Sequence, residues 1–435
     1  MLILVITSAA FAVTAANVDR SSDRSHDERF FDDLIVDGVD VSIYQGADTD
    51  WRAAKLSGID FAVMRVTLTR NISGNLETDS AFENQYNNAK EAGLMCGAYV
   101  FSQAANAEEG VKEAEFAAAR LQELGIGPDD LMLPVYMDYE FLNKNGSRLK
   151  NLTQENAIAA AQAFCETIQS YGYDAGIYAN SSFFSGYLNE GQDFSDDIDL
   201  WIAQYSSEIN SECQYSKWQY SSTASVPDDE AGSNVFNKVD INYWYIDREM
   251  GDSAISISGS TNIEYSGDAV LPELTLHDGA EQMEEGVDYI VGGINNIESG
   301  TDAYAYIKGI GDYKGYALVP VSISESSFES INLPSKVISS TNYDDTGYKI
   351  YSDSGRTSIG TVPEGISAKE LLADIYLSND DYHTELLDSS GEIKDKDDTV
   401  SFSDMIGVYN DDDTLIGTID IETETEKGIN HISHR

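Results

Sequence analysis

The stretch Leu133-Pro134-Val135-Tyr136-Met137-Asp138-Tyr139-Glu140 is an apolar run that ends in two acids. Its composition predicts a short buried β-strand. Side chains alternate along a strand, so Asp138 and Glu140 point to the same side, with Cα atoms about 6–7 Å apart. A partly buried carboxyl beside a carboxylate keeps its proton to higher pH, as a general acid requires. The alternative is that both acids only end the strand in a solvated loop.

Similar apolar runs recur on both sides of this stretch, and helical patterns separate several of them. Strands that alternate with helices predict parallel pairing and right-handed crossovers. About 215 residues of this pattern, from 35 to 250, fit a β/α barrel, which is typically ~250 residues long. Chemistry in such barrels lies at the carboxyl ends of the strands. The other runs are Val39–Ile43, Phe61–Val66, Gly97–Phe101, Ala175–Ala179, Leu200–Tyr205, Lys217–Tyr220 and Val239–Ile241.

Three helices are predicted between these runs. Asn106 is expected to cap one of them, with Glu109 completing a capping box and Gly125 ending the helix. The others run from Thr153 to Gly172 and from Asp79 to Gly93, each with apolar residues on one face.

Two more acids stand inside apolar triplets, which is costly unless the acids are paired or used. They are Asp40 in the first strand and Asp240 in the last. First and last strands of a closed barrel are neighbours, so these two acids should approach each other and share one mouth with Asp138 and Glu140. Arg65 is a lone cation in an apolar strand and is expected to pair with one of the acids.

Aromatic and amide side chains near the strand ends could bind sugars, because sugar rings stack on aromatic rings and hydroxyls need polar partners. About half of the aromatic residues are expected to be core instead. The candidates are Tyr44, Tyr99, Tyr178, Trp201, Tyr205 and Trp218, with Gln45, Gln204 and Gln219 as polar partners.

Several chemistries are excluded by composition. No histidine lies between residues 35 and 250, which argues against a catalytic triad and a catalytic zinc site. No phosphate-binding glycine loop follows a strand, so no cofactor and no metal are expected. The net charge of −50, from 76 acidic and 26 basic residues, excludes nucleic acid as a partner.

The ends of the chain and its cysteines bear on location. Residues 1–16 are expected to be a cleaved signal peptide, although no basic residue precedes the apolar run, and an uncleaved anchor is the alternative. Residues 17–34 are expected to form a flexible polar leader. Three cysteines without CxxC spacing indicate core residues rather than a disulfide framework, with one disulfide left open. A secreted protein, extracellular or associated with the cell wall, is predicted.

The composition and residue pattern of the sequence change after about residue 255. Tryptophan disappears, and short alternating runs separated by Gly, Asn and Asp take over. Residues 255–325 predict an all-β sandwich. Residues 345–423 predict a small α+β or mostly β module with one helix, for which Ser367 and Glu370 form a capping box. Residues 424–435 are expected to be a flexible tail.

The residues between 35 and 246 resemble glycoside hydrolase family 25, and the motifs occur in the right order along the chain. The resemblance rests on Asp40-Val41-Ser42-x-Tyr44-Gln45-Gly46, Trp51, Gly97-Ala98-Tyr99, Pro134-Val135-x-x-Asp138-x-Glu140, Gly176-Ile177-Tyr178-Ala179-Asn180, Leu200-Trp201-Ile202-Ala203-Gln204-Tyr205, Trp218-Gln219-Tyr220 and Val239-Asp240-Ile241-Asn242.

The resemblance implies an irregular β/α barrel of the family 25 lysozyme type, an N-acetylmuramidase. It implies hydrolysis of the β-1,4 bond between N-acetylmuramic acid and N-acetylglucosamine in peptidoglycan. Glu140 would be the proton donor, Asp138 would steer the N-acetyl group or stabilise the developing positive charge, and Asp40 and Asp240 would complete the acids. The implied substrate-binding residues are Tyr44, Arg65, Tyr99, Tyr178, Trp201, Gln204 and Trp218.

The later segments have weaker relatives. Gly286-x-Asp288-Tyr289 and Gly309-x-Gly311-x-Tyr313-x-Gly315 look like an Ig-like repeat of clostridial cell-surface proteins. The last segment resembles a small module at the ends of similar secreted proteins. These parts are expected to act as spacers or to contact cell-wall polymers, in a monomeric protein. Two alternatives remain: an inactive wall-binding or adhesion protein, and a hydrolase of another polysaccharide such as chitin.

Overall fold

The computed structural model describes residues 24–142, 147–228, 233–248, 255–264, 268–297, 302–324, 338–341, 349–353, 356–360, 362, 366–378, 381–388, 391–400, 404–421, 429–430 and 432–434. The expected signal peptide lies outside these residues. The chain divides into two compact units. The first comprises the segment up to Phe31, Ile35–Leu124 and Leu133–Tyr245, and the second comprises Ile246–Arg435 with Asp32–Leu34 and Gly125–Met132.

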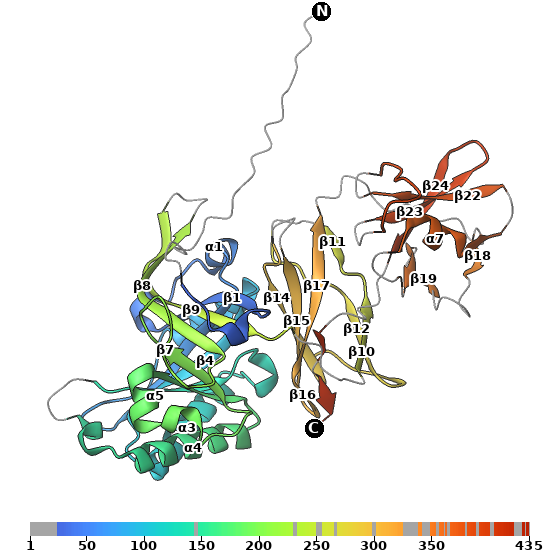
Figure 1. Cartoon of the computed structure of the whole chain (residues 1–435). Helices are drawn as coiled ribbons and strands as arrows, with labels where there is room; N and C mark the ends of the chain where they lie inside the picture. Colours follow the sequence, from blue (N-terminus) through green and yellow to red (C-terminus); the bar gives the residue numbers. More distant parts are fainter. Residues whose placement is uncertain are drawn as a thin grey trace, which may run out of the picture. The chain divides into compact units, whose positions relative to one another are not determined.

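The first unit is built around a closed sheet of eight strands, in blue to green in Figure 1. The strand order is β1-β9-β8-β7-β6-β5-β4-β2, with β3 beyond β2, and the pairing of β1 with β2 closes the ring. The prediction of a closed barrel is therefore confirmed. The strands are β1 (Leu34–Val41), β2 (Phe61–Thr69), β3 (Leu76–Thr78), β4 (Met95–Ser102), β5 (Val135–Tyr139), β6 (Ala175–Asn180), β7 (Asp199–Ala203), β8 (Lys217–Asp228) and β9 (Ser233–Ile246).

The strands β1, β2, β4, β5, β6, β7 and β8 run parallel to one another. A helix lies between each of these parallel strands and the next, up to β7. Among the residues that the structure describes, no helix lies between β7 and β8 or between β8 and β9, and the last two strands pair antiparallel as a long hairpin. The expected alternation of strands and helices therefore stops at β7. The helices are α1 (Trp51–Leu56), α2 (Phe82–Glu91), α3 (Ala107–Glu123), α4 (Gln154–Ser170) and α5 (Ser181–Tyr187).

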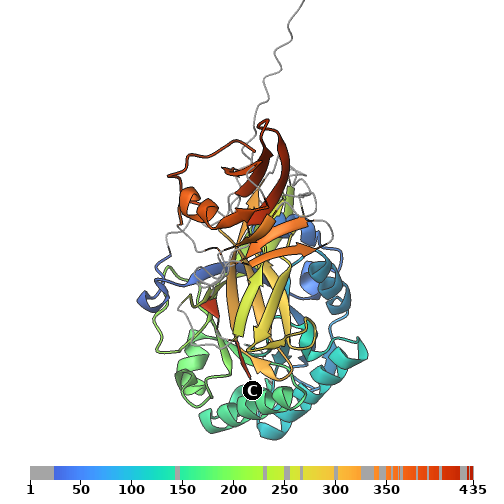
Figure 2. The same ribbon diagram turned by 90° about the vertical axis from the view of Figure 1, so that its right-hand side faces the viewer.

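Local sequence explains where the two long helices begin and end. The side chains of Asn106 and Thr153 accept the expected capping hydrogen bonds of α3 and α4. Gly125 follows α3 with a positive φ of 73°, which favours glycine. Helices α3 and α4 lie side by side outside the sheet (Figure 1, and teal to green in Figure 2). Gly110 permits this approach, since a Cβ there would lie 2.2 Å from the Ala160 carbonyl oxygen.

The expected polar leader differs from the structure. Residues 24–31 pack on the barrel, and β1 already begins at Leu34. The Phe30 ring stacks on Tyr245 with 3.9 Å between ring centroids, and the side chain is 8% exposed. His26 Nδ1 lies 2.8 Å from the Tyr245 hydroxyl. Aromatic side chains of β8 and β9 therefore hold residues 24–31 on the barrel, although these residues are mostly polar and charged.

The described part of the second unit contains two cores. One lies between two groups of strands, shown in yellow to orange in Figure 2, and the other lies in the last segment. The strands around the first core are β10 (Ile255–Gly259), β11 (Asn262–Glu264), β12 (Leu274–Asp278), β13 (Glu281–Gln282), β14 (Tyr289–Ile294), β15 (Ala303–Gly309), β16 (Tyr313–Lys314) and β17 (Tyr316–Ser324). All of them except β16 form the sheets β10-β12-β13 and β11-β17-β15-β14.

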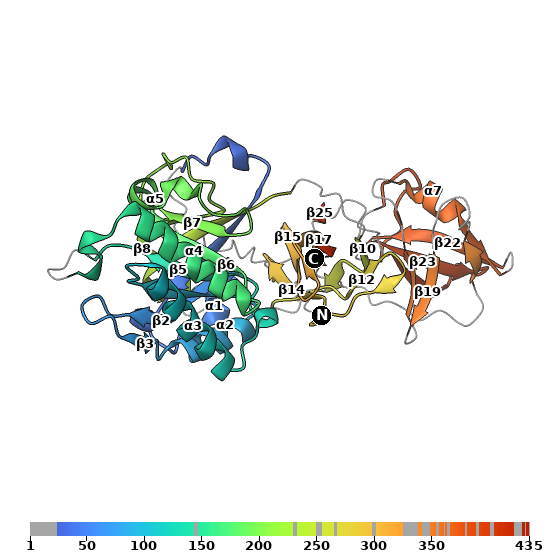
Figure 3. The same cartoon turned by 90° about the horizontal axis from the view of Figure 1, so that it is seen from below.

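The last segment holds a five-stranded sheet, β19-β20-β24-β23-β22, a short pair β18-β21, and helix α7 (Ala368–Ala373), which lies next to β22 in Figure 3. The capping box of Ser367 and Glu370 is confirmed. The strands are β18 (Ile338–Thr341), β19 (Lys349–Asp353), β20 (Arg356–Gly360), β21 (Ile375–Leu377), β22 (Tyr382–Leu387), β23 (Met405–Asn410) and β24 (Leu415–Ile421).

The expected flexible tail also differs from the structure. Its described residues include β25 (Ile429–Asn430), which pairs with β17, and β26 (Ser433–His434), which pairs with β16. Ile432 between them is fully buried in the first of the two cores. All three cysteines are buried and unpaired, as expected for core residues. Within the described ranges, the structure contains no helix with the length and apolarity that a membrane span requires.

Candidate active site

A groove of about 720 Å³ opens at the carboxyl ends of the parallel barrel strands. It receives side chains from β1, β2 and β4 to β9 and from the turns that follow them. All four predicted acids line it. The lining residues are Asp40, Ser42, Tyr44, Gln45, Arg65, Leu68, Thr69, Arg70, Asn71, Ile72, Ser73, Tyr99, Phe101, Asp138, Glu140, Leu142, Tyr178, Trp201, Tyr205, Gln219, Ser222 and Asp240.

The closed sheet explains why acids from distant parts of the chain meet. Asp138 is the fourth residue of β5, and Glu140 directly follows that strand. Asp40 lies near the end of β1 and Asp240 lies in β9, and these two strands are neighbours in the sheet. Strand closure thus places the first and last acids together, as the sequence predicts.

Burial and mutual repulsion raise the pKa values of the two deeper acids. Asp40 is 7% exposed and Asp138 is 8% exposed. Burial raises the pKa of Asp40 well above its ordinary range, and the Asp240 charge adds to the rise. Burial likewise raises the pKa of Asp138, followed by the charges of Glu140 and Asp40. One Asp138 oxygen, Oδ1, is buried and has no hydrogen-bond partner among the described residues.

The two outer acids behave in the same way. Burial raises the pKa of Glu140, and the Asp240 charge raises it further. Burial raises the pKa of Asp240 to about 6, against a small opposing effect of Lys238. Interacting carboxyls titrate together. The cluster therefore retains protons at a pH where isolated carboxyls are ionised, and it can supply both an acid and a carboxylate.

Two buried amides orient Asp40. Gln219 was expected to be a polar partner of sugar hydroxyls, and Asn242 was not among the predicted site residues. Asn242 Nδ2 donates to Asp40 Oδ2 at 2.9 Å, and Gln219 Nε2 donates to the same oxygen at 2.8 Å. Both hydrogen bonds lower the Asp40 pKa and so partly oppose burial. Asn242 stands two residues after Asp240 in β9, and this i, i+2 spacing was the available signal.

The same amides connect the aromatic side of the groove to Asp40. Trp201 Nε1 donates to Asn242 Oδ1 at 2.9 Å. The hydroxyls of Tyr178 and Tyr205 donate to Gln219 Oε1 at 2.8 and 2.7 Å. Because each amide accepts from aromatic residues and donates to Asp40, its orientation is fixed by its neighbours.

Arg65 has a different partner from the one expected. Its Nε and Nη2 atoms lie 2.8 and 2.7 Å from Asp79 Oδ2, and Asp79 is not one of the four groove acids. Asp79 was expected to begin a helix, but α2 begins at Phe82. The Asp79 carboxylate also accepts backbone N–H groups of Ile43 and Ala81. Arg65 still lines the groove, where its charge lowers the pKa of Asp138.

The predicted substrate-binding residues fall into two groups. Tyr44, Arg65, Tyr99, Tyr178 and Trp201 line the groove. Trp218 and Gln204 do not. Trp218 is 1% exposed and packs against Tyr243 among the aromatic residues of β8 and β9. The Gln204 amide nitrogen instead donates to Ser206 and to the Glu208 carbonyl oxygen.

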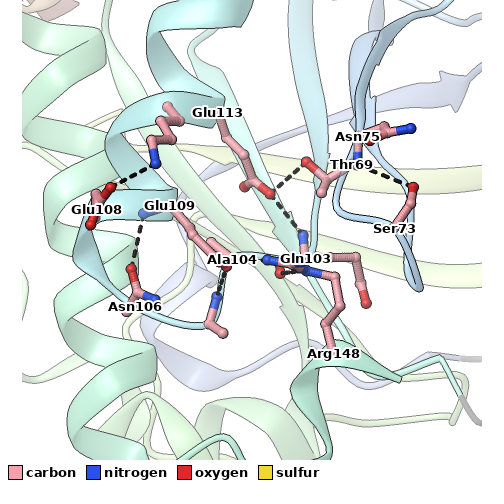
Figure 4. A network of polar contacts seen from close by, with 12 residues as sticks. Thr69, Ser73, Asn75, Gln103, Ala104, Asn106, Glu108, Glu109, Glu113 and Arg148 are labelled. Atoms are coloured by element: carbon pink, nitrogen blue, oxygen red, sulfur yellow. Dashed lines mark hydrogen bonds and ion pairs between the residues drawn. The ribbon is translucent and has the colours of Figure 1, made fainter. Parts of the chain in front are cut away.

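Sequence reasoning missed the wall formed by Arg70–Ser73 in the turn between β2 and β3. Buried polar contacts at the base of this turn are shown in Figure 4. Glu113 Oε1 accepts from the Thr69 hydroxyl at 2.6 Å and from the Gln103 backbone N–H at 3.0 Å. Glu109, expected to close a capping box on Asn106, instead accepts from Ala105 N and pairs with Arg148.

Gln103 extends this network to the acids, because its side-chain amide donates to the Glu140 carbonyl oxygen at 3.2 Å. The ends of β2, β4 and β5 are thereby joined by side chains. Among the described residues no cluster of three or more potential ligands suits a metal ion.

Comparison with known proteins finds lysozymes. The chain is 26% identical over 196 residues to "Lysozyme M1" of Streptomyces globisporus, covering 44% of this chain and 63% of that protein. It is 26% identical over 190 residues to "Autolytic lysozyme" of Clostridium acetobutylicum, covering 43% of this chain and 51% of that protein. The matched part thus spans less than two thirds of either relative.

Among solved structures, a family 25 glycosyl hydrolase from Bacillus anthracis is 22% identical and covers 52% of this chain and 94% of that chain, with a TM-score of 0.41. A lysozyme from Streptomyces coelicolor is 24% identical and covers 48% and 91%, with a TM-score of 0.39. Residues 39–229, which contain three of the four groove acids, match the family described as glycosyl hydrolases family 25.

Proposed function

We propose that this protein is a peptidoglycan hydrolase, an N-acetylmuramidase that cleaves the β-1,4 bond between N-acetylmuramic acid and N-acetylglucosamine. The observation that carries the proposal is the gathering of Asp40, Asp138, Glu140 and Asp240 in one groove, three of them within the residues 39–229 that match family 25. Hydrolysis of a glycosidic bond ordinarily needs one protonated and one ionised carboxyl group. The four interacting carboxyls, all with raised pKa values, can supply one of each.

Glu140 is the proposed proton donor. It stands at the end of β5, less enclosed than Asp138, where an incoming sugar can reach it. Its raised pKa favours the protonated carboxyl that a general acid needs, and the proton passes to the leaving oxygen as the bond breaks. Water supplies the hydroxyl group that ends on the other sugar.

Asp138 is the proposed electrostatic partner of that step. It shares a groove with Glu140, and its unpartnered oxygen could accept from the N–H of an acetamido group. As Glu140 gives up its proton, positive charge develops on the sugar ring, and carboxylates nearby stabilise that charge. Asp40 and Asp240 contribute to the same negative field, and the amides of Asn242 and Gln219 hold Asp40 in place.

A single substitution tests the assignment. Glu140→Gln keeps the size of the side chain and removes its transferable proton, so we expect release of reducing ends from peptidoglycan to fall by at least about 100-fold. Glu115→Gln on the exposed face of α3 is the matched control and should keep full activity. Undiminished activity in the Glu140 variant would remove the proton-donor assignment.

The products identify the substrate. Mass spectrometry should find N-acetylmuramic acid at the new reducing ends. Release of sugars from chitin alone would favour a hydrolase of another polysaccharide. Binding to cell walls without any cleavage would favour an inactive wall-binding protein. Either result would overturn the proposal.

We further propose a modular organisation for the whole chain. The first unit is a closed barrel of the family 25 type within residues 35–250. Residues 255–325 form an Ig-like sandwich, a proposal supported by two sheets that share one core. Residues 345–423 form a separate small module with its own core. These parts serve as spacers or contact cell-wall polymers in a secreted monomer.

A further inference from the structure

The rim of the groove carries a cation that the proposed chemistry does not use. Two arginines line the groove, Arg65 and Arg70. Arg65 is buried and held by Asp79. The Arg70 side chain is 56% exposed, and its ion pair joins Nη2 to Glu77, itself 42% exposed. Arg70 is therefore the groove arginine that solvent, or a ligand, can readily reach.

The backbone of Arg70 is fixed by its turn. Arg70 N donates to the Asn75 carbonyl oxygen at 2.9 Å, and Gly74 N donates to the Arg70 carbonyl oxygen at 2.8 Å. Asn75 N donates to the Ser73 hydroxyl at 3.2 Å, as Figure 4 shows. Gly74 has a φ of 70°, in the region that favours glycine. The turn thus holds Arg70 at one place on the rim.

A second set of contacts ties the turn to the body of the barrel. Arg148 N donates to the Asn71 carbonyl oxygen at 3.3 Å. The Arg148 guanidinium fills the space beside Gly74, where a Cβ would lie 2.2 Å from Nη1. Arg148 in turn pairs with Glu109 of α3 at 2.5 Å. Because the turn is packed against a fixed side chain, little ordering is needed when a ligand binds.

The rim near Arg70 also offers apolar surface. Tyr44 is 85% exposed and close enough to Arg70 for its phenol to affect the Arg70 pKa. Ile72, two residues beyond Arg70, is 70% exposed. Both line the groove. An exposed aromatic ring and an exposed aliphatic side chain beside a cation suit a sugar that carries a negatively charged substituent.

We propose that Arg70 binds a carboxylate carried by the glycan strand and so selects carboxylate-bearing strands over uncharged ones. The inference rests on the proposed function. Two carboxylates of peptidoglycan share this chemistry: those of the stem peptide, and the lactyl carboxylate of muramic acid once the peptide has been removed.

Charge makes this contact decisive. The chain has a net charge of −50, and the groove contains four acids, so an anionic substituent is repelled elsewhere. Screening limits that repulsion to about 8 Å at physiological salt, so a cation at the point of contact matters most. An exposed ion pair such as Arg70–Glu77 contributes little and can be replaced by a ligand. The planar guanidinium then binds a carboxylate through two parallel hydrogen bonds.

The test measures how fast the full-length protein cleaves three substrates. The first is intact peptidoglycan, the second is peptidoglycan glycan stripped of its peptides, and the third is peptidoglycan whose free carboxylates have been converted to amides. We expect Arg70→Gln to lower kcat/KM by about tenfold, or ~1.4 kcal/mol, on the substrate that carries the recognised carboxylate. That substrate is intact peptidoglycan for the stem peptide and the stripped glycan for the lactyl group. It should leave kcat/KM on the amidated substrate within about twofold. Arg70→Lys should restore part of the loss because it keeps the charge.

The stripped glycan distinguishes the two carboxylates. A tenfold loss on the stripped glycan alone assigns the contact to the lactyl group, because that carboxyl is bound as an amide in intact material. A loss confined to intact material assigns the contact to the stem peptide. Arg120→Gln is the matched control, since Arg120 pairs with Glu83 and Glu123 and does not line the groove. Equal losses on intact and amidated substrates, or no loss on either the intact or the stripped substrate, would overturn the inference. Wild-type protein that cleaves none of the three would instead overturn the proposed function.

Discussion

Asp240 should destabilise the barrel at neutral pH, and Asp240→Asn should relieve this. Burial raises the pKa of Asp240 from 3.8 to about 6. A raised pKa means that the folded protein holds the proton more tightly than the unfolded chain between these values. The stability from this group is therefore fully present below pH ~4 and is lost as pH rises through 6.

The size of the effect follows from the same pKa. At ~1.36 kcal/mol per pH unit, a rise from 3.8 to about 6 corresponds to at most ~3 kcal/mol. Asparagine has nearly the same shape and does not ionise. We therefore expect the stability of Asp240→Asn relative to wild type, measured as the difference in free energy of unfolding, to increase by about 2–3 kcal/mol from pH 4 to pH 7.

Urea unfolding followed by tryptophan fluorescence is the suitable assay, because all four tryptophans lie between residues 51 and 244 and so report on the barrel. Taking the difference between variant and wild type at each pH cancels the titration of acids that do not interact with Asp240. The Asp240 charge raises the pKa values of Asp40 and Glu140, so its removal lowers both and acts in the same direction. Glu115→Gln, on the exposed face of α3, should show no such pH dependence. An Asp240→Asn difference that is the same at pH 4 and pH 7 would refute the reasoning.

Two further substitutions test the supports of the site. Asn242→Ala removes the 2.9 Å hydrogen bonds to Asp40 and from Trp201. Because these buried groups are left without that partner, the free energy of unfolding in urea should fall by about 1–3 kcal/mol. An unchanged urea midpoint would show that these two hydrogen bonds do not stabilise the barrel. Phe30→Ala removes a buried ring stacked on Tyr245 and should cost about 2–4 kcal/mol in urea unfolding. A cost below about 0.5 kcal/mol, the level of a surface substitution, would mean that residues 24–31 do not stabilise the barrel.

The gathering of the acids could be predicted because it depends on local pattern and one topological rule. The run before Asp138 is a strand, side chains two apart share a side, and the first and last strands of a barrel are neighbours. Together they predict that Asp40, Asp138, Glu140 and Asp240 share one groove, and the prediction does not depend on the conformation of any loop. The caps of α3 and α4 were equally local, since each depends on a side chain and an N–H three residues away.

Contacts between distant segments could not be predicted in the same way. Arg65 was expected to pair with a groove acid, but it pairs with Asp79, because β3 runs back antiparallel along β2 and brings Asp79 beside that strand. Trp218 looked like a sugar-binding residue because of its motif, yet it is enclosed by the aromatic cluster that also holds Phe30. Nothing in the composition of residues 24–31 signals that cluster, whose members are supplied by β8 and β9.

The meeting of β1 with β9 has a consequence for biosynthesis. A ribosome makes Asp40 two hundred residues before it makes Asp240, and Asn242 emerges later still. Until β9 is complete, Asp40 lacks Asn242 as its hydrogen-bond donor and the ring of strands stays open. A nascent chain therefore cannot assemble the groove early, and the order of translation itself delays the onset of any wall-degrading activity until the whole barrel has been made.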